Sequence, residues 1–219
     1  MTVPSLEEIR DQLAAHEPRQ LEDHEGQRAA VAMVLRDGAP GLEVLFIERA
    51  QHERDPWSGH MAFPGGRVDP SDTDTRAAAE RETLEEVGLS LAQATLLGRL
   101  DDKTGNPATA KSLVISAYVY HLAASTAQGL VLNEEVAAAL WFPVNDLLEQ
   151  VHHVPYVMRQ YDNIKMPGIL VGEPERHIVW GLTYNFVESF FVAVGEPLPD
   201  HWEPGTRRYD KQRMTGSGG

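Results

Sequence analysis

The segment FPGGRVDPSDTDTRAAAERETLEEVGL, residues 63–89, runs from a Pro-Gly-Gly turn through an acidic loop into an alanine-rich helix. Residues three and four apart share one face of a helix, so Glu82 lies beside both Glu85 and Glu86. Carboxylates at this spacing repel each other, and a cluster of hard oxygen donors is what Mg²⁺ or Mn²⁺ prefers. The segment therefore predicts a divalent-metal site on one helix face. The alternative is a solvated face on which Arg81 pairs with Glu85.

Apolar, β-branched and aromatic runs on both sides of this segment predict the strands of a sheet. The predicted strands are residues 29–35, 42–48, 94–101, 113–121 and 138–142. Turn residues around Asp37-Gly38 and Pro40-Gly41 separate the first two, which we expect to form a hairpin. Strands before and after a central helix, with a second helix at the end, indicate an α/β or α+β domain whose mixed sheet lies between helices.

Further helices are predicted near both ends of the chain. Residues 5–15 form a short amphipathic helix, with Ser5 as N-cap and Glu8 three residues later. Residues 181–195 form an apolar core helix with Thr183 as a candidate N-cap. Residues 151–177 are predicted to be mostly loop, with a short β-hairpin as one option. We divide the chain into an N-terminal helix and linker (1–26), a main domain (27–198) and a disordered tail (199–219).

The composition restricts the classes of partner. The chain of 219 residues has 19 Lys and Arg against 33 Asp and Glu, a formal net charge of -14, so it has no general attraction for nucleic acid or anionic membranes. An anionic substrate would need bound metal to invert the local field. The absence of cysteine excludes disulfides and thiolate sites. No apolar run has the length of a membrane span and no signal-peptide core is present, so we expect a cytoplasmic protein.

Residues 81–89, RETLEEVGL, resemble the second half of the Nudix box, in which Arg-Glu, two glutamates and a glycine recur between aliphatic positions. The first half of that box is a glycine followed after five residues by a glutamate. Gly66 and Asp72 have this spacing, with Asp in place of Glu. Eight residues separate Asp72 from Arg81, where the family has seven, and Thr83 stands where an aliphatic residue is usual. The resemblance implies an α/β/α sandwich with a mixed central sheet.

A longer pattern resembles the coenzyme A pyrophosphatase branch of the Nudix hydrolases. That branch carries aliphatic residues, two arginines and a glycine upstream of FPGG. Arg49, Arg54 and Gly59 occupy these positions, with one extra residue between Arg54 and Gly59. The segment HIVWGLT before the last helix also resembles this branch. The resemblance covers residues 29–195 and implies a nucleoside diphosphate linked to another moiety as substrate, with coenzyme A or a derivative as the first choice.

The resemblance also implies roles for individual residues. Glu82 and Glu86 would be metal ligands, and Glu85 a further ligand or the base that takes the proton of the attacking water. Arg81 would pair with a glutamate and fix its conformation. A further acidic ligand from a later loop would be Glu135, with Glu134 as the alternative. Substrate contacts are expected from Arg49, Arg54, Gly65 and Gly66.

Other substrates and other functions stay open at this point. The same chemistry acts on ADP-ribose, nucleotide sugars, dinucleoside polyphosphates and nucleoside triphosphates in this fold, and loops select among them. A different class is a Nudix-fold binding module without catalysis, which would predict loss of the glutamates. Members of the family are often dimers, so the N-terminal helix would either join two copies or cap the sheet.

Overall fold

The computed structural model describes residues 2–22, 26–39, 41–52, 57–105, 113–123, 129–158 and 163–199. Its organising element is a mixed sheet of eight strands within these residues. The strands are β1 (Gln27–Gly38), β2 (Gly41–Arg49), β3 (Met61–Ala62), β4 (Gly65–Arg67), β5 (Thr95–Arg99), β6 (Lys103–Thr104), β7 (Leu113–Leu122) and β8 (Val136–Pro143). The predicted hairpin is confirmed, because β1 and β2 pair antiparallel from Leu35 and Val44 to the turn.

The sheet is mixed because β1 and β7 run parallel along their whole length, while the other pairs are antiparallel. Along one edge of β2 the partner changes from β1 at residues 41–44 to β3 at residues 47–48. Along the other edge β2 pairs with β8, and a register shift falls between Glu48 and Arg49. Strand β2 therefore ends at an irregular point of the sheet, directly at Arg49.

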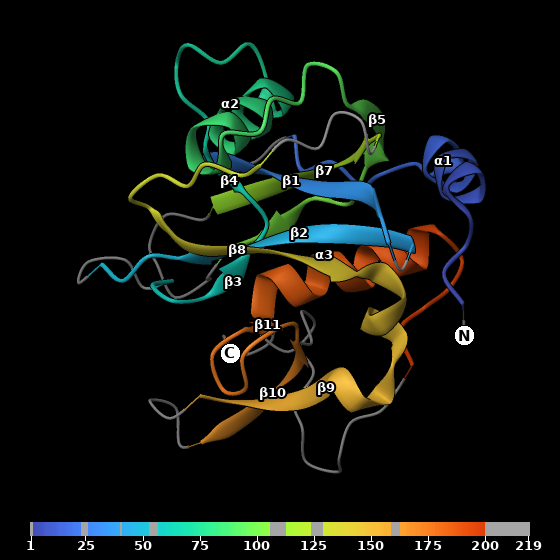
Figure 1. Cartoon of the computed structure of the whole chain (residues 1–219). Coiled ribbons are helices and arrows are strands. Elements are labelled where there is room, and N and C mark those ends of the chain that lie inside the picture. Colours follow the sequence, from blue (N-terminus) through green and yellow to red (C-terminus); the bar gives the residue numbers. More distant parts are fainter. Residues whose placement is uncertain are drawn as a thin grey trace, which may run out of the picture.

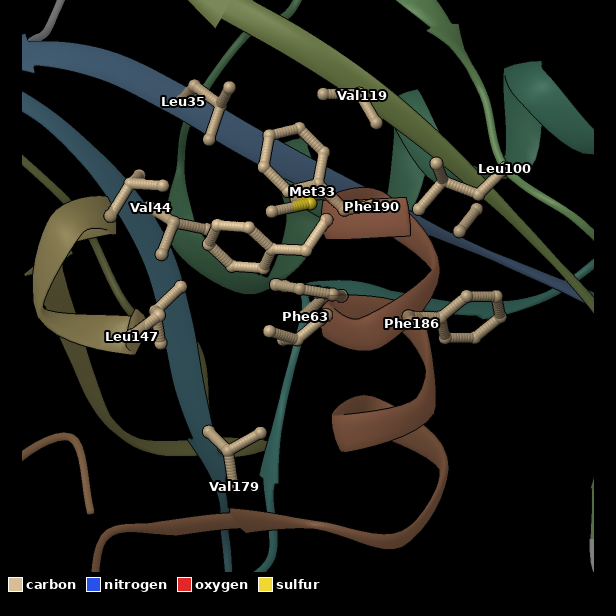
Figure 2. Close-up of a cluster of buried hydrophobic side chains, with 14 of the residues drawn as sticks. Met33, Leu35, Val44, Phe63, Leu100, Val119, Leu147, Val179, Phe186 and Phe190 are labelled. Atoms are coloured by element: carbon tan, nitrogen blue, oxygen red, sulfur yellow. The ribbon is translucent and has the colours of Figure 1, made fainter. Parts of the chain in front are cut away.

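Two helices cover opposite faces of this sheet (Figure 1). Helix α2 (Thr75–Val87) lies on one face, where Ala78 and Ala79 are buried against β1 and β2. Helix α3 (Gly181–Ala193) lies on the other face, where its phenylalanines pack with Met33 and Leu35 of β1 (Figure 2). The predicted α/β/α sandwich is confirmed.

The short helix α1 (Leu6–Ala15) lies at the β5 edge of the sandwich. The capping box predicted for it is present, since Ser5 accepts from Glu8 N and the Glu8 carboxylate accepts from Ser5 N at 2.8 Å. Ile9 and Leu13 are buried in the same core as α3, with Leu13 lying against Gly98 of β5. The helix therefore closes one end of the hydrophobic core.

Residues 151–177 were expected to be mostly loop, which is wrong for the described part, whereas the β-hairpin given as one option is present. Here a second, antiparallel sheet is built from β9 (His153–Met158), β10 (Ile164–Leu170) and β11 (Ile178–Trp180). It follows two 3₁₀ helices, η1 (Val144–Leu148) and η2 (Gln150–His152). Pro155, Pro167 and Gly168, which suggested loop, lie inside paired strands, where Pro155 faces Pro167.

The last helix is confirmed, but its N-cap is not Thr183. The N-cap is Trp180, which makes no capping bond with its side chain, and Thr183 lies within the first turn. Gly181 takes a positive φ of 59° at the helix start, a conformation that favours glycine. Of the predicted tail, residues 200–219 lie outside the described residues. None of the helices described is both long enough and apolar enough to cross a membrane.

Candidate active site

Helix α2 carries the predicted glutamates, and its ends are fixed by local hydrogen bonds. Asp74 is the N-cap and accepts a hydrogen bond from Ala77 N at 2.8 Å. At the other end Gly88 has a φ of 68° and donates its N–H to Leu84 O at 3.0 Å. These bonds fix where the helix begins and ends. Burial of Ala78 and Ala79 sets the face that lies on the sheet, and Glu86 contacts the Pro-Gly-Gly segment through Gly65 N.

The FPGG segment joins that helix to the sheet. Phe63 is buried and stacks on Phe46 of β2 at 5.2 Å between ring centroids. Gly65 and Gly66 were predicted to form a turn, and instead begin β4, which pairs with β1. A side chain at Gly65 would collide with the backbone of β1, and one at Gly66 would collide with the carboxylate of Glu82. The two glycines therefore let helix, loop and strand meet at this point.

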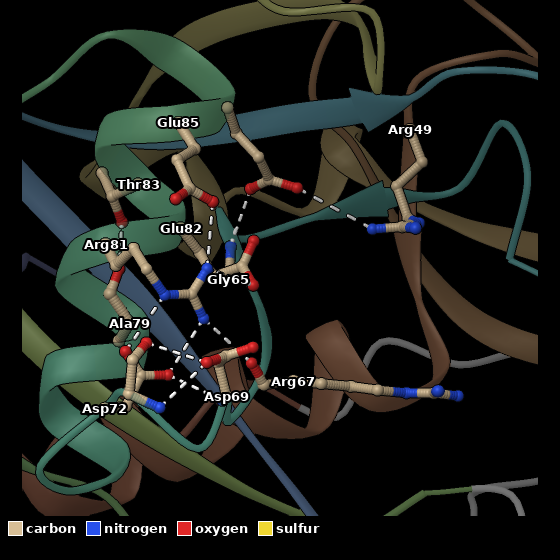
Figure 3. A network of polar contacts seen from close by, with 12 residues as sticks. Arg49, Gly65, Arg67, Asp69, Asp72, Ala79, Arg81, Glu82, Thr83 and Glu85 are labelled. Carbon is tan, nitrogen blue, oxygen red and sulfur yellow. Dashed lines mark hydrogen bonds and ion pairs between the residues drawn. The ribbon is translucent and has the colours of Figure 1, made fainter.

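Glu86 is the most deeply buried of the three helix glutamates, with 2% of its surface exposed. Its Oε2 accepts a hydrogen bond from Gly65 N at 2.8 Å, and Arg49 Nη1 lies 3.9 Å from Oε1 (Figure 3). Burial raises the pKa of Glu86 to about 7, the Gly65 bond and Arg49 oppose the rise, and the charges of Glu82 and Glu135 add to it. This carboxylate would be stabilised in its ionised form by a further cation.

Arg81 connects the acidic loop to the helix (Figure 3). It donates to both oxygens of Asp72 at 3.0 Å, to Glu82 at 3.0 Å and to Glu85 at 2.9 Å. A further bond goes to Arg67 O at 3.1 Å. The hydrogen bonds from Arg81 lower the pKa of Asp72, which is almost completely buried. Asp72 therefore pairs with Arg81, and Arg81 pairs in turn with Glu82 and Glu85.

Glu135 belongs to the loop before β8 and lies near the helix glutamates. Its backbone O accepts a hydrogen bond from Ala50 N at 2.8 Å, which ties this loop to the end of β2. Its charge contributes to the raised pKa values of both Glu82 and Glu86. The side chain itself is exposed. The predicted set of Glu82, Glu85, Glu86 and Glu135 thus comes from two segments that adjoin at one end of the sheet.

These residues fit a divalent metal ion by the chemistry of their donors. All are carboxylates, and burial raises the pKa of Glu82 as well as that of Glu86. Within the described residues, no group of three acidic or histidine side chains is already arranged as a complete ligand set. Arg81 occupies one oxygen each of Glu82 and Glu85. The second oxygen of each carboxylate can therefore bind a metal ion while Arg81 holds the first.

Of the predicted substrate contacts, Arg49 adjoins the glutamates, whereas Arg54 lies outside the described residues. Sequence reasoning missed a second group of polar residues behind Arg49. Glu48 is buried and bonded to Arg176, and His177 lies beside it. The partners are 128 residues apart in the chain, so spacing could not reveal them. The usable signal was Glu48, a charged residue at the end of a predicted strand that is otherwise apolar except for Glu43.

Comparison with known proteins agrees with this geometry. The NUDIX domain family model matches residues 26–161. The protein named Nudix hydrolase NudL of Salmonella newport is 30% identical over 77% of this chain and 83% of its own length, and NudL of Enterobacter is 29% identical with the same coverage. The chain therefore belongs to the NUDIX domain family and is a Nudix hydrolase. An uncharacterized protein of Schizosaccharomyces pombe is 42% identical over 48% of this chain, and the match covers 33% of that protein's own length.

Solved structures support the fold. A MutT/nudix family protein from Enterococcus faecalis has a TM-score of 0.52 at 19% identity, covering 88% of this chain and 70% of its own. A NUDIX hydrolase from Alicyclobacillus acidocaldarius has a TM-score of 0.52 at 20% identity, covering 81% of this chain and 100% of its own. At these identities the likeness extends to the fold alone.

Proposed function

We propose that this protein is a Mg²⁺- or Mn²⁺-dependent pyrophosphohydrolase that cleaves coenzyme A or a derivative to phosphopantetheine and 3′,5′-ADP. The observation that carries the chemistry is the buried Glu86 carboxylate, whose pKa is raised to about 7 by burial and by the neighbouring Glu82 and Glu135. A buried carboxylate surrounded by others favours a bound cation. A chain of net charge -14 also needs such a cation before an anionic diphosphate can approach.

Each residue then has a task in the hydrolysis. Glu82 and Glu86 would hold the metal, joined by Glu135, and the metal would neutralise phosphate charge and lower the pKa of bound water. Glu85 lies at the rim, with 53% of its side chain exposed, and serves as a further ligand or as the base. The water oxygen bonds to one phosphorus as its proton moves to the base, and the bridging P–O bond breaks. Arg81 keeps the glutamates oriented through this step.

The choice of coenzyme A rests on the upstream pattern shared with that branch of the family. Arg49 lies 3.9 Å from Glu86, and Gly59 N donates to Arg49 O at 3.0 Å. Arg49 thus adjoins Glu86, with Gly59 bonded to its backbone, and its cationic side chain would contact a phosphate of the substrate. This supports coenzyme A as the substrate over the substrates of family branches whose sequences lack this pattern.

The test is hydrolysis of a panel of diphosphates by the purified protein, with and without Mg²⁺ or Mn²⁺, with products identified by mass spectrometry. The panel contains coenzyme A, acetyl-coenzyme A, ADP-ribose, a nucleotide sugar, a dinucleoside polyphosphate and a nucleoside triphosphate. We expect metal-dependent release of 3′,5′-ADP from the coenzyme A compounds, and loss of this activity in Glu86→Gln. Preferred turnover of another member would replace the substrate assignment. Metal binding without turnover of any member would favour the binding-module alternative.

A further inference from the structure

The end of strand β2 presents two charged residues to opposite faces of the sheet. Side chains alternate along a strand, and Phe46 belongs to the core under α3 while Ile47 belongs to the core under α2. Glu48 accordingly lies on the α3 side, and Arg49 lies on the α2 side with its guanidinium 3.9 Å from Glu86. The position of this strand end therefore determines where Arg49 stands relative to the site.

Two neighbouring residues of the turn before β11 contact Glu48: Arg176, which is hydrogen-bonded to it, and His177, which lies beside it. Arg176 donates Nε to Oε1 at 2.9 Å and Nη2 to Oε2 at 2.8 Å, a bidentate contact that fixes both distance and orientation. His177 Nδ1 accepts a hydrogen bond from Glu173 N, so its Nε2 carries the proton and faces Glu48 at 3.5 Å. Glu175, just before this pair, has a positive φ of 64°, as a tight turn requires.

The residues that follow, up to Thr183, also contact His60 and strand β3, which lie next to Arg49. Trp180 packs edge-on against the ring of His60 at 4.8 Å, and Thr183 Oγ1 donates to Met61 O at 3.1 Å. His60 in turn is bonded to Arg49, since Arg49 N donates to His60 O at 3.1 Å. Residues 176–183 thus contact the strand end that bears Arg49 on two sides, through Glu48 and through β3.

We infer that residues 176–183 form a brace that positions Arg49 against Glu86 and the substrate phosphates, with Glu48 and Arg176 as its positioning residues. The inference rests on the proposed function for its catalytic consequence. Glu48 is buried whereas Arg176 is half exposed, and burying a carboxylate costs free energy that such a pair seldom repays, so stability alone does not explain a carboxylate at position 48. A two-point contact one residue before Arg49 does explain it, because such a contact restricts where the arginine can lie.

The decisive test is a double-mutant cycle between Glu48→Gln and Arg49→Gln. Arg49→Gln should lower kcat/KM about 100-fold, and Glu48→Gln about 10-fold, since small misplacements of a charged group have effects of this size. The double variant should lose no more than Arg49→Gln alone, because Glu48 acts through Arg49. Arg176→Lys keeps the charge but loses the two-point contact. Its kcat/KM should lie between those of the wild type and Glu48→Gln. If the double variant instead lost kcat/KM by the product of the two single losses, the two residues would act independently and the inference would be wrong.

Glu43→Gln provides a matched control. Glu43 lies on the same strand, near its other end, and its carboxylate pairs with Arg36 at 2.7 Å. Removing this charge weakens a partly buried ion pair of β2 without touching the end that carries Arg49. The thermal unfolding temperature should fall for both Glu43→Gln and Glu48→Gln, whereas kcat/KM should change only for Glu48→Gln. An equal loss of kcat/KM in the two variants would mean that Glu48 is merely structural.

A second readout needs no turnover. Mn²⁺ affinity, measured by electron paramagnetic resonance without substrate, should rise about threefold to tenfold in Arg49→Gln, because a cation beside Glu86 is removed. Glu48→Gln should shift it in the same direction by less, and should add nothing in the Arg49→Gln background. The inference would be wrong if Glu48→Gln changed the Mn²⁺ affinity equally in the wild-type and Arg49→Gln backgrounds, or changed it in neither. A wild-type protein that hydrolyses no panel member would contradict the proposed function, while this cycle would still decide the brace.

Discussion

Glu86 and Asp102 are both buried carboxylates, and their surroundings shift their pKa values in opposite directions. Asp102 is fully buried and accepts hydrogen bonds from Leu21 N at 2.9 Å, from Arg99 at 2.7 Å and from Ser116 at 2.9 Å. Burial opposes its ionisation, but these donors outweigh it and lower its pKa. Glu86 has one backbone donor and a guanidinium at 3.9 Å, and its pKa rises to about 7.

The difference separates an anchor from a reactive site. The donors to Asp102 tie the linker after α1 to the sheet, so the carboxylate is ionised and satisfied within the fold. Glu86 is left short of positive charge although it is equally inaccessible. Strongly raised pKa values of buried acids are typical of functional sites, because the fold bears an unfavourable charge that a ligand then stabilises.

The largest effects should come from neutralising the two carboxylates in separate variants. Glu86→Gln should lower kcat by at least about 100-fold, since even residues that only support a metal ligand are worth 10- to 100-fold. It should also leave folding intact, because an amide is easier to bury than a charged group. Steady-state kinetics with the best panel substrate and urea unfolding provide the two measurements.

Asp102→Asn should give the reverse result. Here an amide replaces a carboxylate that pairs with Arg99, and the free energy of unfolding should fall by about 3 kcal/mol. At temperatures where the variant is folded, kcat should stay within a factor of about two, because Asp102 belongs to the linker anchor. Loss of kcat in folded Asp102→Asn would break the distinction between anchor and site.

Stability should respond to pH with opposite signs at the two residues. The pKa of Glu86 is raised in the folded protein, so the metal-free protein should lose up to about 3 kcal/mol as the pH rises from about 4.5 to 7. Asp102 has a lowered pKa, so its contribution is present above the ordinary aspartate pKa and is lost as the pH falls below it. Urea unfolding in EDTA should show the first loss in the wild type but not in Glu86→Gln. Parallel profiles for the two proteins would contradict this assignment.

Local signals predicted the elements that bear the site. Helix α2 follows from its alanine-rich run, and the hairpin follows from turn residues between two apolar runs. The glutamate face follows from helix periodicity alone. In each case the determining residues lie within a few positions of one another, which is the range over which sequence patterns are informative.

What the sequence did not reveal depends on contacts between distant segments. In residues 151–177 loop was favoured over the β-hairpin, because prolines and glycines suggest loop and only strand pairing makes them tolerable. Asp72 could not be given a role, since its pairing with Arg81 depends on how the acidic loop folds back. The contact between Glu48 and Arg176 bridges two sheets and leaves no periodic trace. Such features follow from tertiary packing rather than from local preference.

A smaller effect is expected from Asp72→Asn, because Asp72 is satisfied like Asp102 yet lies beside the active site. The variant would weaken both bonds to Arg81, which would then hold Glu82 and Glu85 less firmly. We expect kcat to fall about 10-fold. Kinetics of Arg81→Lys should show a loss of similar size, and the double variant should lose little more. An unchanged kcat in Asp72→Asn would place Asp72 with the structural carboxylates.

The smallest effect concerns helix α1, which precedes the linker that Asp102 anchors. Ser5→Ala removes the side-chain oxygen that caps α1, and loss of such a cap costs about 1 kcal/mol. The loss should be smaller than that of Asp102→Asn, because Ile9 and Leu13 keep the helix docked in the core without its cap. Urea unfolding measures the change, and kcat should be the same as in the wild type. If Ser5→Ala instead lowered kcat, α1 would have to influence the glutamates from the far edge of the sheet, and the separation of anchor from site would not hold.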